Sequence, residues 1–312
     1  MKKTHILKAL LLFLFSFQLV AGTVNKSPAD PREYKTFFLK NGMEVITVSD
    51  PELATSAATL NIGVGFFQDP QEAQGIAHFL EHMIFMGSKK YKSPNEYMEF
   101  ITQNGGSTNA FTAAEQTTYL FSINNKKFAP ALDRLSAAIM EPLFDGTMVE
   151  KEINAVNSEW LKNRQTDAFI QQRTLALTGN PSHPRVKLGV GNKDTLGSNE
   201  EQLLGSLRDF HEKFYSANLM KLVLVGNQSS KELAKLAMQT TAAAAFGESS
   251  DTPGVEKEEG DAKTRSDGGD AAELSAVSRI LGQSDANQAW VYSAYKMTQP
   301  KKFKKGSFGK FR

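Results

Sequence analysis

The segment QGIAHFLEHMIFMG, from Gln74 to Gly87, places two histidines and a glutamate close together in an otherwise apolar run. The chain has only five histidines in 312 residues, so this pairing is a strong constraint. We expect a helix over residues 71–86, on which His78 and His82 lie one turn apart on the same face and Glu81 flanks them. The remaining side chains form an apolar surface. The fold must therefore bury this helix while its three polar groups share one site.

Two imidazoles one turn apart suit a zinc ion, which binds histidine nitrogen at about 2.0–2.1 Å, and a carboxylate beside the open coordination position suits water activation. The alternative is a pair of core histidines or a helix held by ion pairs. The full H-x-x-E-H pattern would arise by chance in roughly one of a few hundred chains this poor in histidine, so we favour a metal site. This order of residues marks the inverzincins. Mn²⁺ or Co²⁺ could substitute for zinc in vitro.

A third protein ligand is expected, because catalytic zinc sites typically have three protein ligands and a water. A second helix, predicted over residues 147–164, contains Glu152 and Glu159, which are two turns apart and point to one side. Apolar neighbours indicate that this helix is largely buried, and a buried carboxylate needs a partner. The pattern alone leaves either glutamate as the third ligand.

The predicted elements indicate an α/β fold of the α+β type. The composition, 40% hydrophobic and 22% charged, is typical of a chain with a globular core. An Asn-Gly pair at Asn41 predicts a hairpin. Further strands are expected over residues 58–67, 108–112, 117–123 and 221–226, and further helices over residues 94–104, 127–140, 169–177, 200–215 and 229–239. Because strands and helices interleave irregularly, we expect a mainly antiparallel sheet packed by helices rather than a doubly wound parallel sheet.

The first residues resemble a secretory signal. Lysines precede an apolar run over residues 9–17, and small residues follow at Val20-Ala21-Gly22. The alternative is a membrane anchor, but the run is shorter than the roughly 20 residues that span a bilayer. We therefore expect a periplasmic or secreted protein with no stable membrane span after signal removal. The absence of cysteine excludes disulfides, thiol catalysis and a lipid-modified N-terminus.

These patterns divide the chain into four segments. We expect a signal peptide at 1–22, a polar linker at 23–33, one folded domain at 34–239, and a low-complexity, disordered tail at 240–312. The basic end of the tail could bind anionic surfaces, but a solvated tail with no dedicated partner is the favoured interpretation. A net charge of +2 does not indicate a polyanionic partner, so no nucleic acid is expected.

Two segments, 75–88 and 150–163, resemble the signature segments of the pitrilysin–insulinase family of zinc metallopeptidases (M16-type inverzincins). In that family the H-x-x-E-H helix supplies two histidine ligands and the general base. The resemblance therefore implies one Zn²⁺ ion with His78 and His82 as ligands and Glu81 as the catalytic base.

The same resemblance separates the two downstream glutamates. Glu159 follows His82 by 77 residues, as the third ligand of the family does, so the metal-ligand role falls on Glu159. Glu152 matches a further glutamate that supports the site in the family. These two segments and the two described next match the family, and all four occur in the family's order between residues 34 and 239.

The stretch GGSTNAFTAAEQTTYLF resembles the family strand whose exposed edge pairs with the substrate backbone. The resemblance implies that Asn109, Ala110 and Phe111 bind a peptide by β-augmentation. The stretch NPSHPRVKLGVGNKDTL resembles a family loop, in which we expect His183 to be structural.

The resemblance implies a zinc-dependent metalloendopeptidase domain that hydrolyses oligopeptides or unfolded segments. Family enzymes close two homologous halves around the substrate, and the other half supplies an arginine and a tyrosine that we cannot place in residues 240–312. The first hypothesis is a catalytic domain, completed by a partner chain or by a homodimer. The second is a truncated, catalytically incomplete half that binds zinc and peptide and needs a second homologous domain or subunit. The third is an exported binding protein with an accidental motif.

Overall fold

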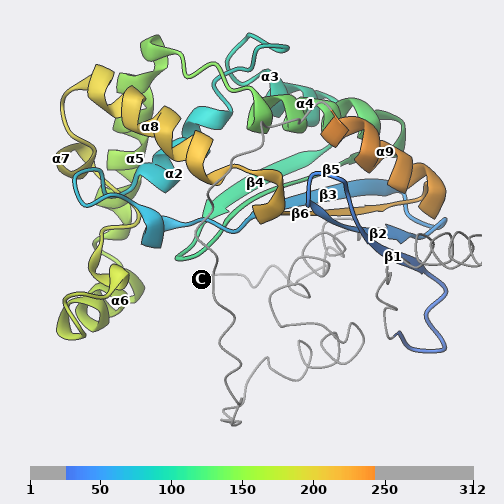
Figure 1. Cartoon of the computed structure of the whole chain (residues 1–312), viewed down its shortest axis with the longest axis horizontal. Helices are drawn as coiled ribbons and strands as arrows, with labels where there is room; N and C mark the ends of the chain where they lie inside the picture. The colour runs from blue at the N-terminus through green and yellow to red at the C-terminus, as the bar shows by residue number, and fades with distance from the viewer. Residues whose placement is uncertain (1–25, 243–312) are drawn as a thin grey trace, which may run out of the picture.

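Figure 1 shows a computed structural model of the chain, in which residues 26–242 are described. The predicted signal peptide and all but the first three residues of the predicted tail lie outside the described residues. The described part is built around one sheet, with helices stacked on one side of it in the view of Figure 1. No helix in residues 26–242 is both long enough and apolar enough to cross a membrane.

Six strands form the sheet in the order β1-β2-β6-β3-β5-β4. The strands are β1 (Glu33–Phe38), β2 (Glu44–Ser49), β3 (Thr55–Ile62), β4 (Ser107–Thr112), β5 (Thr117–Asn124) and β6 (Met220–Gly226). Only β2 and β6 pair in parallel; the other neighbouring pairs are antiparallel. The expectation of an α/β fold with a mainly antiparallel sheet is therefore confirmed.

The predicted hairpin at Asn41 joins β1 to β2. Gly42 has φ +85°, a left-handed conformation that glycine adopts without strain, and the amide of Leu39 donates to the carbonyl of Met43 over 2.9 Å. The predicted strand over residues 58–67 was wrong at its end, because β3 stops at Ile62. Beyond Ile62 the amide of Phe66 turns to donate to Ala113, and the chain enters the short 3₁₀ helix η1 (Phe66–Gln68).

The helices are α2 (Ile76–Ile84), α3 (Glu96–Gln103), α4 (Phe128–Met140), α5 (Val149–Asn163), α6 (Asp167–Thr178), α7 (Lys193–Leu196), α8 (Glu200–Phe214) and α9 (Ser230–Ala242). Helix α2 packs against α5 and α8 and against the edge strand β4. Helix α6 is different, since in Figure 1 it extends away from the layer of helices. This arrangement places the H-x-x-E-H segment between the sheet edge and α5.

Helix α2 begins later than the predicted residue 71 because Gly75 has φ +96°, outside the helical region. The backbone of Gly75 lies so close to Gly191 that a Cβ would collide with it, which fixes the start of the helix against a distant loop. Asp69, in the preceding turn, accepts hydrogen bonds from the amides of Gly75 (2.7 Å) and Ala77 (3.1 Å). The carboxylate therefore satisfies two amides that the first turn leaves without intrahelical partners.

Candidate metal centre and substrate groove

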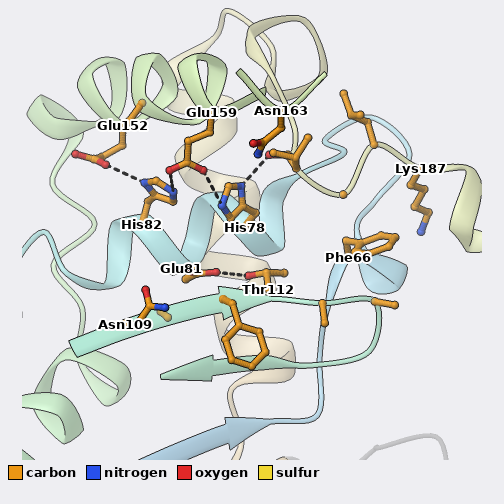
Figure 2. A pocket seen from close by; sticks show the side chains of 18 of the residues that line it. Phe66, His78, Glu81, His82, Asn109, Thr112, Glu152, Glu159, Asn163 and Lys187 are labelled. Atoms are coloured by element: carbon orange, nitrogen blue, oxygen red, sulfur yellow. Dashed lines mark hydrogen bonds and ion pairs between the residues drawn. The ribbon is translucent and has the colours of Figure 1, made fainter. Parts of the chain in front are cut away.

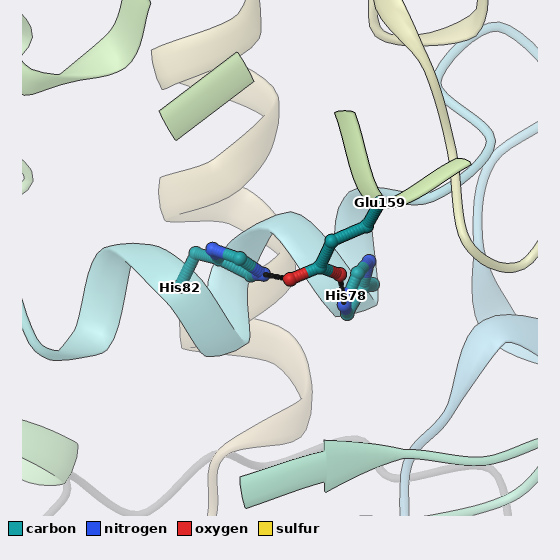
Figure 3. A group of neighbouring side chains, drawn as sticks. All are labelled: His78, His82 and Glu159. Carbon is teal, nitrogen blue, oxygen red and sulfur yellow. Dashed lines mark ion pairs between the residues drawn. The ribbon is translucent and has the colours of Figure 1, made fainter. Parts of the chain in front are cut away.

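Three side chains from two helices converge on one point (Figure 3). Oε2 of Glu159 lies 3.4 Å from Nε2 of His78, and Oε1 lies 3.8 Å from Nε2 of His82. The candidate ligand atoms of the three residues all lie within 4.8 Å of one another. Tetrahedral zinc with bonds of about 2.0–2.1 Å holds its ligand atoms roughly 3.3 Å apart. Two imidazoles and a carboxylate at these distances fit zinc after small side-chain movements.

The other nitrogen of each imidazole already has a partner. Nδ1 of His78 lies 2.8 Å from the carbonyl oxygen of Val190, and Nδ1 of His82 lies 3.2 Å from the carboxylate of Glu152. Both partners accept a hydrogen bond from an Nδ1–H group, so each ring keeps Nε2 as a lone-pair donor. Such outer contacts orient metal-binding histidines and increase their basicity. Glu152 is itself buried, which explains why it needs the histidine.

The two histidines differ in their proton affinity. Burial lowers the pKa of His78, and the neighbouring His82 lowers it further. Burial also acts to lower the pKa of His82, but the hydrogen bond to Glu152 and the charge of Glu159 outweigh it, so that this pKa is raised. Because a metal binds the unprotonated nitrogen, a metal ion at this candidate site would compete with protons, most strongly at His82.

Glu81 lies below the metal-binding residues and faces the edge strand (Figure 2). Its side chain is almost fully buried at 8% exposure, and Oε2 accepts a hydrogen bond of 2.6 Å from the hydroxyl of Thr112. Burial raises the pKa of Glu81 to about 7, although the Thr112 hydrogen bond and the nearby His82 oppose the shift. A carboxyl group with a pKa near neutrality is suited to exchange protons with a substrate.

The edge strand β4 borders a groove of about 980 Å³. Asn109 and Phe111 are exposed on β4 and line the groove with the half-buried Ala110. Among residues 26–242, strand β4 pairs only with β5 and is last in the sheet order, so no described strand covers its other edge. The three residues implicated in substrate binding therefore lie where an added peptide strand would pair.

The groove has two distinct ends (Figure 2). The His82 end carries Glu152 and Asn109, and the His78 end carries Phe66 and Lys187. All eight residues that the sequence singled out line this groove: His78, Glu81, His82, Asn109, Ala110, Phe111, Glu152 and Glu159. The structure thus brings them together, while their roles stay predictions.

The sequence did not predict two contacts of the site. Thr112 donates a hydrogen bond to Glu81 and directly follows the three predicted substrate-binding residues. The only sequence feature that could have indicated its role is its place on the same predicted strand. The carbonyl of Val190 belongs to the loop that resembles a family loop, to which we assigned no role in the site. A backbone carbonyl is present in every residue, so the residue type could not indicate this contact. His183, in the same loop, accepts a hydrogen bond of 3.1 Å from the amide of Arg185 and lies outside the metal centre, which agrees with its expected structural role.

Comparisons with known proteins match two family models. Residues 44–182 match the model described as Insulinase (Peptidase family M16), and residues 203–303 match the one described as Peptidase M16 inactive domain. The first match contains every residue of the candidate metal centre. The second continues beyond residue 239, where we expected the resemblance to end, and beyond the described residues.

Curated relatives include human insulin-degrading enzyme, which is 40% identical over 224 residues, covering 70% of this chain and 22% of that protein. Protease 3 of Escherichia coli (strain K12) is 43% identical over 225 residues, covering 72% of this chain and 23% of that protein. This chain thus spans about a quarter of the length of these relatives.

Two solved structures extend the comparison to the fold. The crystal structure of pitrilysin superposes with a TM-score of 0.70 at 40% identity, covering 79% of this chain and 26% of that chain. A protease from Helicobacter pylori gives a TM-score of 0.60 at 20% identity, covering 67% of this chain and 50% of that chain, and supports the fold alone.

Proposed function

This chain belongs to the pitrilysin–insulinase family, peptidase family M16, and from that premise we propose that its folded domain is a zinc-dependent metalloendopeptidase domain that hydrolyses oligopeptides or unfolded segments. One observation carries the proposal: the ligand atoms of His78, His82 and Glu159 converge while the buried carboxyl of Glu81 faces the same groove. A metal centre beside the exposed edge of a strand is suited to hydrolysing a peptide that pairs with that edge.

In this proposal Nε2 of His78, Nε2 of His82 and the carboxylate of Glu159 would hold one zinc ion. Zinc, when bound, lowers the pKa of a coordinated water toward roughly 7 and polarises a carbonyl oxygen. Glu152 keeps the ring of His82 in place through its 3.2 Å contact with Nδ1.

The protein groups then handle the proton and the substrate. Glu81 accepts the proton of the attacking water and transfers it to the leaving amine, which the raised pKa of its carboxyl favours. The hydroxyl of Thr112 fixes the carboxylate from the opposite wall. The free edge of β4 pairs with the substrate backbone, with Asn109, Ala110 and Phe111 beside it.

A second candidate is a zinc- and peptide-binding half that turns over substrate only when a second homologous domain or subunit covers the groove. The openness of the site favours it: the side chain of Glu159 is 48% exposed, and Phe111 is 42% exposed. A catalytic site that excludes water strengthens its electrostatic interactions. In this candidate the covering domain supplies that exclusion.

The test is cleavage of an internally quenched, unstructured peptide by the purified protein, with metal removed by a chelator and restored with Zn²⁺. We expect cleavage that the chelator abolishes and zinc restores. His82→Ala should abolish zinc binding, whereas His183→Ala, which changes an exposed histidine outside the centre, should retain it. Zinc binding without cleavage would favour the second candidate, and a folded protein that binds no zinc would contradict both.

A further inference from the structure

Three cationic side chains gather at the His78 end of the groove. They are Arg173 on α6, Arg185 in the 3₁₀ helix η4 (Pro184–Val186) and Lys187 just after it, and all three line the groove. Within residues 26–242 none of the three forms an ion pair with a carboxylate. A group of like charges beside a binding groove that no described carboxylate neutralises by an ion pair needs an explanation, because like charges repel.

Arg173 is held in place by neutral groups. Its Nη1 donates to the carbonyl oxygens of Val186 (3.1 Å) and Lys187 (2.9 Å), which connects α6 to the last residue of η4 and the residue after it. These bonds use one nitrogen of a guanidinium that carries five N–H donors in a rigid fork. Burial lowers the pKa of Arg173, because a partly buried guanidinium loses some of the hydration of its charge.

Lys187 is similarly anchored. Its Nζ donates to the carbonyl oxygens of Phe67 (2.7 Å) and Asp69 (2.6 Å), so its direct partners are neutral. Burial raises the pKa of the nearby Asp69 carboxyl to about 7, a shift that the charge of Lys187 opposes without forming an ion pair. Arg185 is exposed and lines the groove.

The two ends of the groove therefore differ in charge. The His82 end carries the carboxylate of Glu152, while the His78 end carries the three cations. Strand β4 runs between them: its last residue, Thr112, is followed by Ala113, whose carbonyl accepts a hydrogen bond from the amide of Phe66 at the His78 end (Figure 2). A peptide paired with β4 that passes the metal centre thus arrives at the cations.

We propose that Arg173, Arg185 and Lys187 form a subsite for a carboxylate of the bound peptide, supplied by an aspartate or glutamate side chain or by the peptide's C-terminus. The inference rests on the proposed peptide binding at β4. Arginine binds carboxylates through two parallel hydrogen bonds, and charged hydrogen bonds are about twice as strong as neutral ones. Phe66 adds an apolar wall against which the methylene groups of a glutamate side chain pack. The subsite selects one residue of the substrate and fixes its register along β4.

The test uses the zinc-loaded Glu81→Gln variant, which is expected to bind peptide without cleaving it. Fluorescence anisotropy measures its affinity for a series of unstructured labelled peptides in which one glutamate occupies each position in turn. Matching peptides carry glutamine or lysine at the same position. Each peptide is made with a free and an amidated C-terminus. If a side chain is the ligand, the peptide with glutamate at one position should bind about tenfold more tightly than the peptide with lysine there. If the C-terminus is the ligand, amidation should weaken binding about tenfold.

Arg185→Glu in the same background should remove the preference or reverse it toward lysine. Arg208→Glu is the matched control, because Arg208 is exposed on α8 and does not line the groove, and it should leave the preference unchanged. Equal affinity for all peptides, or the same preference in both variants, would overturn the subsite, as would the absence of any binding. Wild-type protein that fails to cleave peptides that the variant binds with this selectivity would overturn the proposed catalysis and leave the subsite standing.

Discussion

Helices α2 and α6 both line the groove, yet they are built in opposite ways. Of the nine residues of α2, seven are buried, and the two that are not are His78 and His82. Of the twelve residues of α6, only Ala176 is buried, and its apolar side chains include Leu177 at 63% exposure. Three of the groups proposed for chemistry, His78, Glu81 and His82, therefore stand on a helix fixed by the core. Arg173, proposed for recognition, stands on a helix largely surrounded by solvent.

The difference has a physical reason. Metal ligands need positions correct to a few tenths of an ångström, and only packed elements with partnered side chains provide them. Helix α2 meets this demand through its buried face, through Asp69 at its start, and through the outer contacts of both histidines. A cation that attracts a carboxylate acts over a longer range and tolerates a less constrained support.

The largest expected difference concerns packing. Leu80→Ala on α2 removes a side chain with 0% exposure and should cost about 2–5 kcal/mol of unfolding free energy, since it leaves a cavity in the core. Leu177→Ala on α6 is the same chemical change at an exposed site and should stay within about 0.5 kcal/mol. Urea denaturation of the metal-free proteins measures both. Equal costs at the two sites would mean that α6 is packed as firmly as α2.

The next effect concerns the outer support of the metal centre. Glu152→Ala removes the partner of Nδ1 of His82 and should weaken zinc affinity about 10–100-fold, the usual cost of losing such a contact. Glu150→Ala, two residues earlier on α5 and exposed, is the control and should leave the affinity unchanged. Competition with a chromogenic zinc chelator measures the two. A Glu152→Ala protein with wild-type zinc affinity would show that His82 needs no orienting partner.

The smallest effect compares the starts of the two helices. Asp69→Ala removes a buried carboxylate that binds two amides of the first turn of α2 and should cost about 1–2 kcal/mol. Thr166→Ala removes a long 3.4 Å bond from the amide of Phe169 at the exposed start of α6 and should cost about 0.5 kcal/mol. Thermal unfolding followed by circular dichroism gives both values. A larger loss for Thr166→Ala would reverse the comparison.

The candidate metal centre could be predicted from the sequence because its signals are local. His78, Glu81 and His82 share one helix, and helical periodicity puts them on one face without any knowledge of the fold. Glu159 required two steps: its helix was predicted from periodicity, but the choice between it and Glu152 came from a family resemblance. The structure places Glu159 against both histidines and Glu152 behind His82.

The contacts that the sequence did not predict depend on tertiary structure. The carbonyl of Val190 reaches His78 from 112 residues away, and its role depends on the backbone path of a loop rather than on a side chain. After β3 ends at Ile62, the amides of Phe66 and Phe67 donate to the carbonyls of Ala113 and Ala114, a contact that depends on the path of the chain after β4. The proposed carboxylate subsite likewise combines an arginine of α6 with one residue of η4 and the lysine that follows η4, which periodicity cannot bring together.

The central claim is that Glu81 acts as a base beside a zinc ion held by three other residues. The most direct measurement compares wild type, Glu81→Gln and the exposed control Glu72→Gln for zinc content and for turnover of a quenched peptide. The account predicts that all three bind zinc equally and that Glu81→Gln alone loses activity, by about 10²–10⁴-fold. Wild-type turnover in Glu81→Gln, or loss of its zinc, would contradict the claim.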